Sequence, residues 1–272
     1  VEHTECLGGA YEAYLIDDVL RSVSGVSSVG TISQAQAIKY AQNRGKGFQL
    51  FDWEMHKDVG NLHFFKYGNT DSQGVCGYGT NNYQKVTGLT NALGIRDTVS
   101  YYKEKGGSNP QAEGAYRDGV NYQSVNVLGY ENFQGNKAEW LQYVTVNKTA
   151  ADGRWFITMP DGTERVVQGI TVYNADIYPT HMVWGRYMDL IAAKEGGSTS
   201  SHWFDRFYVG TGLSRVVYRS YYSASALGGV SYASAAYDSS STNASIGVRL
   251  AFRGIIRWAG SVAAFKAINQ AD

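Results

Sequence analysis

Proline, cysteine and net charge are scarce in this chain of 272 residues. Its 3 prolines exclude a proline-rich spacer, and its 2 cysteines are too few for a disulfide framework. Lys plus Arg and Asp plus Glu both number 24, so no net charge is expected to recruit nucleic acid or an anionic membrane. No apolar run reaches about 18 residues, so we expect no membrane insertion. A single bridge between Cys6 and Cys76 stays open, although two reduced thiols are favoured.

Tyrosine and glycine are abundant instead. The chain holds 21 Tyr and 32 Gly, and 43% of its residues are hydrophobic, which is typical of a globular, loop-rich protein. Its length suits one large domain or two ordinary ones. We expect a connector or oligomer contact over 1–30, a ligand-binding domain over 31–254 and a tail over 255–272.

A second absence marks residues 218–246. These 29 residues contain no Lys, Glu, Gln, Met or Trp, but nine Ser, six Ala and five Tyr. Tyrosine gives large amphipathic contact area with few rotors, and small hydroxyls give adaptable hydrogen bonds, as in antibody paratopes. A flexible Ser/Ala-rich linker is the alternative. The apolar run 247–254 that follows is typical of a core strand and argues against a linker.

Local patterns predict helices in the first quarter of the chain. A short helix is expected over 11–23. A capping box at Ser33 and Gln36 predicts a second helix that ends near Gly45. A third is expected over 52–67 before Gly68, and its apolar stripe is Met55, Val59, Leu62 and Phe65.

The rest of the chain is expected to be loops and strands. Residues 68–119 have the composition of a long loop. An alternating strand is predicted over 141–146. A hairpin is predicted from strands at 154–159 and 164–167, because a Pro-Asp-Gly turn separates them.

No motif indicates an enzyme, a metal or a cofactor. His56 and His63 lack a third ligand, and no Gly-x-Ser-x-Gly elbow occurs. Glu131 is expected to be structural, with Arg249 or Arg253 as its ion-pair partner.

Four segments carry a resemblance to a known family. They contain Asp52-x-x-Met55-His56-Lys57-Asp58 through Gln73, Thr87-Gly88-Leu89-Thr90, Gly129-x-Glu131-Asn132-x-x-Gly135-Asn136-x-x-Glu139-Trp140, and Ile246-Gly247-x-Arg249-Leu250-Ala251-Phe252-Arg253-Gly254. With these segments the chain resembles the variable proteins of diversity-generating retroelements, in particular those of phages of gut bacteria. The last two segments also resemble the wider group related to formylglycine-generating enzymes. That group's late pair of copper-binding cysteines has no counterpart here.

The resemblance implies an α+β fold of the C-type-lectin type, with two helices, small antiparallel sheets and long ordered loops. It also implies a hypervariable surface just before the Arg-Leu-Ala-Phe-Arg-Gly strand. In the family, mutated adenines turn Asn codons into codons for residues such as Tyr, Ser, Ala and Asp, and they cannot produce Lys, Glu, Gln, Met or Trp. The residue types missing from 218–246 agree with that rule. Calcium-binding triplets of sugar-binding lectins are missing, so binding without metal is expected.

We therefore expect a phage tail receptor-binding protein, located in the virion, that recognises a bacterial surface protein or glycan. Relatives act as trimers, so a homotrimer is favoured. A bacterial surface-displayed binding protein and a structural virion subunit are the alternatives. The expected supporting scaffold is Trp140, Trp203, Phe204, Phe207, Arg249 and Phe252. The expected ligand-binding residues are Tyr221, Tyr222, Ala224, Ser225, Tyr232, Ser234, Ala236, Tyr237, Asn243 and Ser245.

Overall fold

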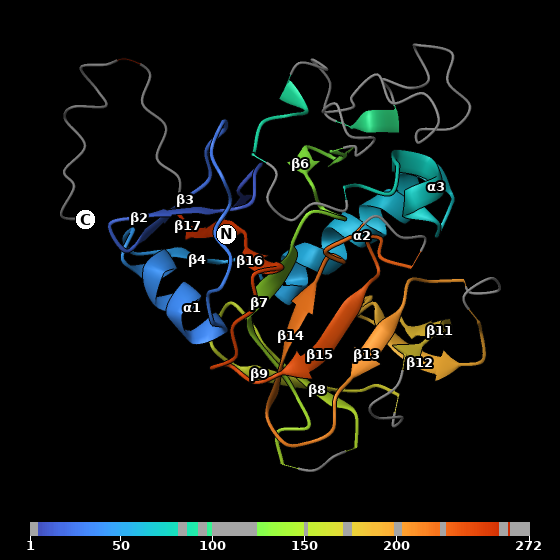
Figure 1. The fold of residues 1–272 in the computed structure, drawn as a ribbon. Helices are drawn as coiled ribbons and strands as arrows, with labels where there is room; N and C mark the ends of the chain where they lie inside the picture. The colour runs from blue at the N-terminus through green and yellow to red at the C-terminus, as the bar shows by residue number, and fades with distance from the viewer. Residues whose placement is uncertain are drawn as a thin grey trace.

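The structure is a computed structural model of the chain. It describes residues 5–80, 86–91, 97–99, 124–149, 152–170, 176–198, 203–223, 227–255 and 261. Within these ranges the chain forms 17 strands and three helices (Figure 1). None of these helices has the length and apolar character that a membrane crossing requires.

An eight-stranded sheet forms the centre of the molecule (Figure 1). Its strand order is β10 (Asp176–Ile177), β13 (Phe207–Val209), β15 (Ala233–Tyr237), β14 (Arg215–Arg219), β7 (Ala138–Val146), β8 (Arg154–Thr158) and β9 (Glu164–Gln168). The eighth strand, β16 (Ile246–Val248), pairs in parallel with the first residues of β7. β13 and β15 are also parallel, so strands distant in sequence lie side by side.

Four smaller sheets accompany the central one. A three-stranded sheet has the order β1 (Glu5–Gly8), β17 (Leu250–Gly254) and β4 (Phe48–Leu50). Three two-stranded ribbons pair β2 (Tyr14–Ile16) with β3 (Val19–Arg21), β5 (Asn126–Val127) with β6 (Tyr130–Glu131), and β11 (Pro179–Val183) with β12 (Ile191–Glu195). Because β1 pairs with β17, residues 5–8 belong to the same fold as the chain's last described strand. The expected division at residues 30 and 254 stays a prediction, and residues 5–8 pair across it with β17.

The expected α+β fold of the C-type-lectin type is wrong. The described chain is mostly β, and its main sheet is large and curled rather than small. The difference arises because the sheet is assembled from long-range pairs. Such pairs depend on strands that lie far apart in sequence, which local periodicity does not reveal.

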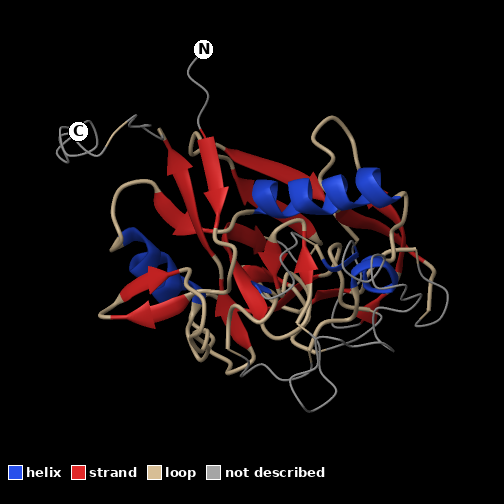
Figure 2. Ribbon diagram, turned by 90° about the horizontal axis from the view of Figure 1, so that it is seen from above, coloured by secondary structure: helices blue, strands red, loops and turns tan. Residues whose placement is uncertain are grey.

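The two longer helices begin and end where the sequence predicts. α1 (Gln34–Gln42) begins at Ser33, whose hydroxyl accepts from the amide of Gln36 in a complete capping box. α2 (Trp53–Tyr67) begins at Asp52 and ends at Gly68, which takes the left-handed conformation with φ 62°. In Figure 1, α2 lies behind β14 and β15; in Figure 2 it is the longest helix. A third helix, α3 (Ser72–Cys76), lies within the expected long loop, most of which falls outside the described residues.

Two other local predictions have opposite outcomes. The hairpin of β8 and β9 is confirmed, and its turn has Gly162 at φ 82°. The helix expected over 11–23 is wrong, because β2 and β3 form a hairpin there. Asp17 and Asp18 both have positive φ in its two-residue turn, which matches the right-handed twist of the strands.

The buried face of α2 also differs from the predicted stripe. Met55 and Val59 are buried, but Leu62 is 58% exposed and Phe65 is 72% exposed. The helix instead packs through Trp53, His56 and His63. Burial lowers the pKa of His63 to about 4, so this imidazole is neutral at pH 7.

Candidate ligand-binding surface

The tyrosines of residues 218–246 form a connected aromatic cluster on β14, β15 and the segment between them. Tyr218 and Tyr237 stack with ring centroids 5.9 Å apart, and Trp140 of β7 contacts Tyr218 edge to face at 5.3 Å. Tyr221 lies 4.8 Å from Tyr222 and 5.3 Å from Tyr232, centroid to centroid. We call Tyr218, Tyr221, Tyr222, Tyr232 and Tyr237 the tyrosine surface.

The tyrosine surface has a buried layer and an outer layer. Tyr218 and Tyr232 are buried, whereas Tyr222 is 40% exposed and Tyr221 and Tyr237 are half-buried. Burial raises the pKa of the Tyr218 and Tyr232 hydroxyls, so both are neutral near pH 7. The buried rings therefore support the outer ones.

Arg206 braces this cluster from β13's side. Its guanidinium carbon lies 4.6 Å from the ring centroid of Tyr221 and 5.6 Å from that of Tyr232. Asp176 pairs with the same guanidinium at 3.2 Å. A cation held over two rings is attracted to their faces and fixes their positions. Sequence reasoning missed Arg206 because its contact with the tyrosines depends on the long-range pairing of β13 with β15.

The segment that leads into β15 is anchored by buried polar groups. Asp205 accepts hydrogen bonds from the amide and hydroxyl of Ser231, at 2.9 and 2.6 Å. The amide of Val230 donates to the hydroxyl of Ser72 at 3.0 Å. A Cβ added at Gly229 would lie 2.1 Å from that hydroxyl oxygen, so only glycine fits at this close approach. The segment is therefore held in place and is not a free linker.

The turn after β15 is held by its own side chains. Asp238 accepts from the amides and hydroxyls of both Ser240 and Ser241. Asn243 accepts from the amide and hydroxyl of Ser245, at 2.9 and 2.8 Å. The backbone carbonyl of Asn243 also accepts from the amide of Thr31. These hydroxyls are engaged within the turn, which keeps it ordered beside α1.

The predicted ligand-binding residues divide into three groups. Tyr221, Tyr222, Ala236, Tyr237, Asn243 and Ser245 are half-buried or exposed. Tyr232 and Ser234 are almost fully buried, at 2% and 1% exposure, so they lie beneath the surface rather than on it. Ala224 and Ser225 lie outside the described residues.

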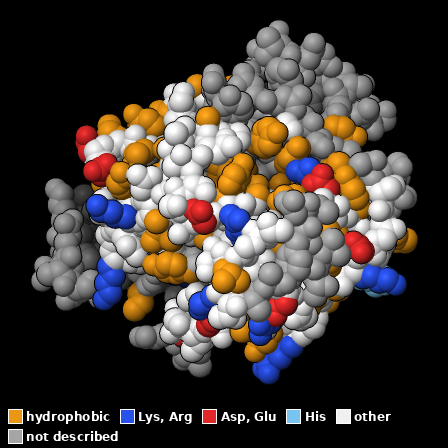
Figure 3. Space-filling model, turned by 60° about the horizontal axis from the view of Figure 1, so that its bottom comes forward, with side chains coloured by type: hydrophobic (Ala, Val, Ile, Leu, Met, Phe, Trp, Pro, Cys, Tyr) orange, Lys and Arg blue, Asp and Glu red, His pale blue; other side chains and the backbone are white. Residues whose placement is uncertain are grey.

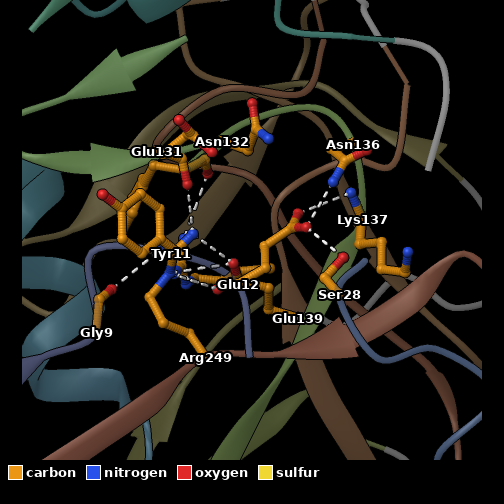
Figure 4. Close-up of polar contacts among 12 residues, drawn as sticks. Gly9, Tyr11, Glu12, Ser28, Glu131, Asn132, Asn136, Lys137, Glu139 and Arg249 are labelled. Atoms are coloured by element: carbon orange, nitrogen blue, oxygen red, sulfur yellow. Dashed lines mark hydrogen bonds and ion pairs between the residues drawn. The ribbon is translucent and has the colours of Figure 1, made fainter. Parts of the chain in front are cut away.

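A buried ion-pair network centres on Glu139, whose contact with Arg249 is drawn in Figure 4. Glu139 of β7 pairs with Arg219 of β14 and with Arg249 between β16 and β17, and all three side chains are fully buried. Arg249 also donates to the carbonyls of Gly9 and Glu131, at 2.9 and 2.7 Å. Burial lowers the pKa of Arg219 to about 10, still well above 7, so the guanidinium keeps its charge beside Glu139.

The expected ion pair between Glu131 and Arg249 or Arg253 is wrong. The Glu131 carboxylate accepts from the amides of Gly88 and Thr90 and from the Thr90 hydroxyl, at 2.6–2.7 Å. Arg253 instead pairs with Asp52, the residue that caps α2. Backbone amides satisfy a buried carboxylate as well as a cation does, and such amides carry no sequence signature.

The predicted scaffold is only partly buried. Trp140 and Arg249 are fully buried, and Phe207 and Phe204 are 1% and 9% exposed. Phe252 is half-buried and packs against Phe48 at 5.1 Å. Trp203 is 68% exposed, so its assignment to the scaffold is wrong.

The described residues include two free thiols, and charged side chains of both signs lie on the face drawn in Figure 3. Cys6 and Cys76 are both free, as favoured from the sequence. In the described part of the chain, no group of three or more His, Cys, Asp or Glu side chains is placed to hold a metal ion. Figure 3 shows Lys and Arg side chains mixed with Asp and Glu on the face it presents, so that face carries charges of both signs.

The chain matches no protein-family model, and no curated protein sequence matches it.

Proposed function

We propose that this protein binds a macromolecular ligand through the tyrosine surface. What supports the proposal is one arrangement on β14, β15 and the segment between them: the outer Tyr237 stacks on the buried Tyr218, and the outer Tyr221 packs against the buried Tyr232 and against Tyr222. Rigid aromatic side chains lose little conformational entropy on binding. An outer tyrosine at the centre of an interface contributes about 2 kcal/mol or more.

We further propose that the surface is hypervariable. The composition of residues 218–246 and the four segments described above support this, because both resemble variable proteins of diversity-generating retroelements. The protein is then a phage tail receptor-binding protein of the virion that recognises a bacterial surface protein or glycan, and it acts as a homotrimer. A reverse-transcriptase gene and a near-copy of the codons for residues 215–254 should lie in the neighbouring DNA.

A display library tests whether the surface is interchangeable. We randomise Tyr221, Tyr222, Ala236 and Tyr237 together and select for binding to an unrelated protein such as serum albumin. Most members should stay folded, with melting temperatures within a few degrees of the parent, and new binders should emerge. The matched control library randomises the buried Tyr232 and Ser234, and most of its members should unfold.

Two outcomes would contradict the proposal. If most members of the first library unfold, the outer tyrosines belong to the core. If they stay folded but yield no binder, the surface is an assembly contact of a structural subunit.

A further inference from the structure

One face of the three-stranded sheet is covered at one end and open at the other. Leu7 of β1 lies opposite Phe252 of β17, and Phe252 lies opposite Phe48 of β4, so these side chains form a row across one face. Leu250 lies two residues before Phe252 on the same face; it is 6% exposed and belongs to the same core cluster as Ala41 of α1. Leu7, in contrast, is 55% exposed. The core on this face therefore ends at Leu250, and the row beyond it is open.

Apolar side chains line a pocket over this row. The pocket has a volume of about 400 Å³ and is lined by Leu7, Phe48, Phe252 and Ile255, which we call the apolar patch. Ile255 follows β17 directly and is 67% exposed. Among the described residues that line the pocket, Arg44 alone is charged, and its guanidinium lies 5.0 Å from the Phe48 ring centroid. The lining therefore suits apolar side chains.

The chain carries an apolar segment that begins at this patch. Residues 256–272 follow Ile255 directly and, apart from Ser261, lie outside the described residues. Only three residues of this segment are charged. Its large apolar residues are Ile256, Trp258, Val262, Phe265 and Ile268. A segment attached at the rim of a site reaches an effective concentration on the order of millimolar there, so modest contacts are enough to hold it.

We propose that residues 256–272 dock on the apolar patch of the same molecule. Trp258 lies three residues after Ile255, a separation that an extended chain spans in about 10 Å, so its ring reaches the pocket. Docking removes the apolar surface of both the patch and the segment from water. A second molecule would lose translational and rotational freedom on covering the patch, whereas the attached segment does not, which favours the segment over a second copy.

The docked segment has a structural consequence for the N-terminal strand. Because the apolar patch includes Leu7 of β1 and Phe252 of β17, a segment lying across it stabilises the pairing of these two strands. The inference does not depend on the function proposed for the tyrosine surface.

Methyl NMR of the full chain, with a soluble gadolinium chelate as the probe of solvent access, tests the inference. Leu7 is 55% exposed and Leu213 is 58% exposed, so the chelate should enhance the relaxation of their methyl groups alike unless something covers one of them. We expect a several-fold smaller enhancement at Leu7 than at Leu213, because the docked segment keeps the chelate away from Leu7.

Variants within the segment identify what covers the patch. Trp258→Ser combined with Phe265→Ser should raise the enhancement at Leu7 to the value at Leu213, while the methyl spectrum keeps the dispersion of the folded parent. Lys266→Ser is the matched control in the same segment and should leave Leu7 protected.

Three results would overturn the inference. The first is equal enhancement at Leu7 and Leu213 in the parent, which means that nothing covers the apolar patch. The second is a double variant in which Leu7 stays protected, because the segment is then not the cover. The third is protection of Leu7 that rises with protein concentration, because a second copy of the chain then covers the patch.

Discussion

Glu12 is a buried carboxylate whose protonation depends on pH near neutrality. Its Oε2 accepts from the hydroxyl of Ser28 at 2.7 Å and from Nδ2 of Asn136, and its Oε1 accepts from the amide of Lys137 (Figure 4). Burial, together with the nearby charge of Glu139, raises the pKa of Glu12 to about 7. The hydrogen bond from Ser28 and the charges of Lys137 and Arg249 oppose that rise without cancelling it.

The raised pKa of Glu12 predicts that the protein is more stable in mild acid than in mild base. Between pH 4.5 and 7 the folded state holds a proton that the unfolded state has released, so the free energy of unfolding falls as pH rises through this window. The contribution is on the order of 3 kcal/mol between pH 4.5 and pH 8. Urea unfolding at several pH values measures it. Glu12→Gln should show a flatter profile than the parent, and an identical pH dependence in both proteins would refute the assignment.

At the scale of single residues, the sequence predicted which side chains have a structural role but not which partners they contact. The sequence indicated that Glu131 is structural and that Arg249 lies in the core, and both side chains are buried. Arg249 nevertheless pairs with Glu139, and Glu131 accepts from the amides of Gly88 and Thr90. Glu131 and Glu139 lie eight residues apart, and the tertiary fold determines which of the two carboxylates lies beside Arg249.

At the scale of elements, the capping residues of α2 determine where the helix begins and ends, whereas packing determines which of its faces is buried. Its ends follow from Asp52 and Gly68, which act locally. Its buried face does not follow from the apolar stripe, because the sheet and the β11–β12 ribbon determine which side of the helix is covered. Gly60, for example, lies where a Cβ would be 2.7 Å from Leu190.

We predict that substitutions along α2 separate by face. Met55→Ala should lower the free energy of unfolding by about 2–5 kcal/mol, because Met55 is 4% exposed in the core. Leu62→Ala on the outer face should change it by less than about 0.5 kcal/mol. Chemical denaturation of both variants measures the difference. Similar losses in the two variants would show that the outer face is packed against something in solution.

At the scale of the whole molecule, Arg249 joins segments from both ends of the chain. Its guanidinium contacts the carbonyls of Gly9 and Ala10, the carbonyl of Glu131 and the carboxylate of Glu139. The N-terminal segment, β6 and β7 therefore meet at one side chain beside β17. Loss of that side chain leaves Glu139 with Arg219 as its partner and three carbonyls without this donor.

Arg249→Met is expected to destabilise the entire fold by about 3–5 kcal/mol, because a buried network loses a charge. Thermal unfolding followed by circular dichroism should show a lower melting temperature with a single cooperative transition. Arg21→Met, at an exposed position on β3, is the matched control and should unfold like the parent. A melting temperature of Arg249→Met equal to that of the control would rule out the joining role.

The sequence by itself determined the features that act over a few residues. These include the caps of α1 and α2, the turn between β8 and β9, and the tyrosine and serine composition of residues 218–246. Only the tertiary structure decided which tyrosines lie in the outer layer and that Arg206 braces them. It also decided that the sheet is large and that Leu62 and Phe65 face outward. The physical reason is that capping and turn chemistry are local, whereas exposure depends on long-range strand pairing that covers one face of each element and leaves the other open.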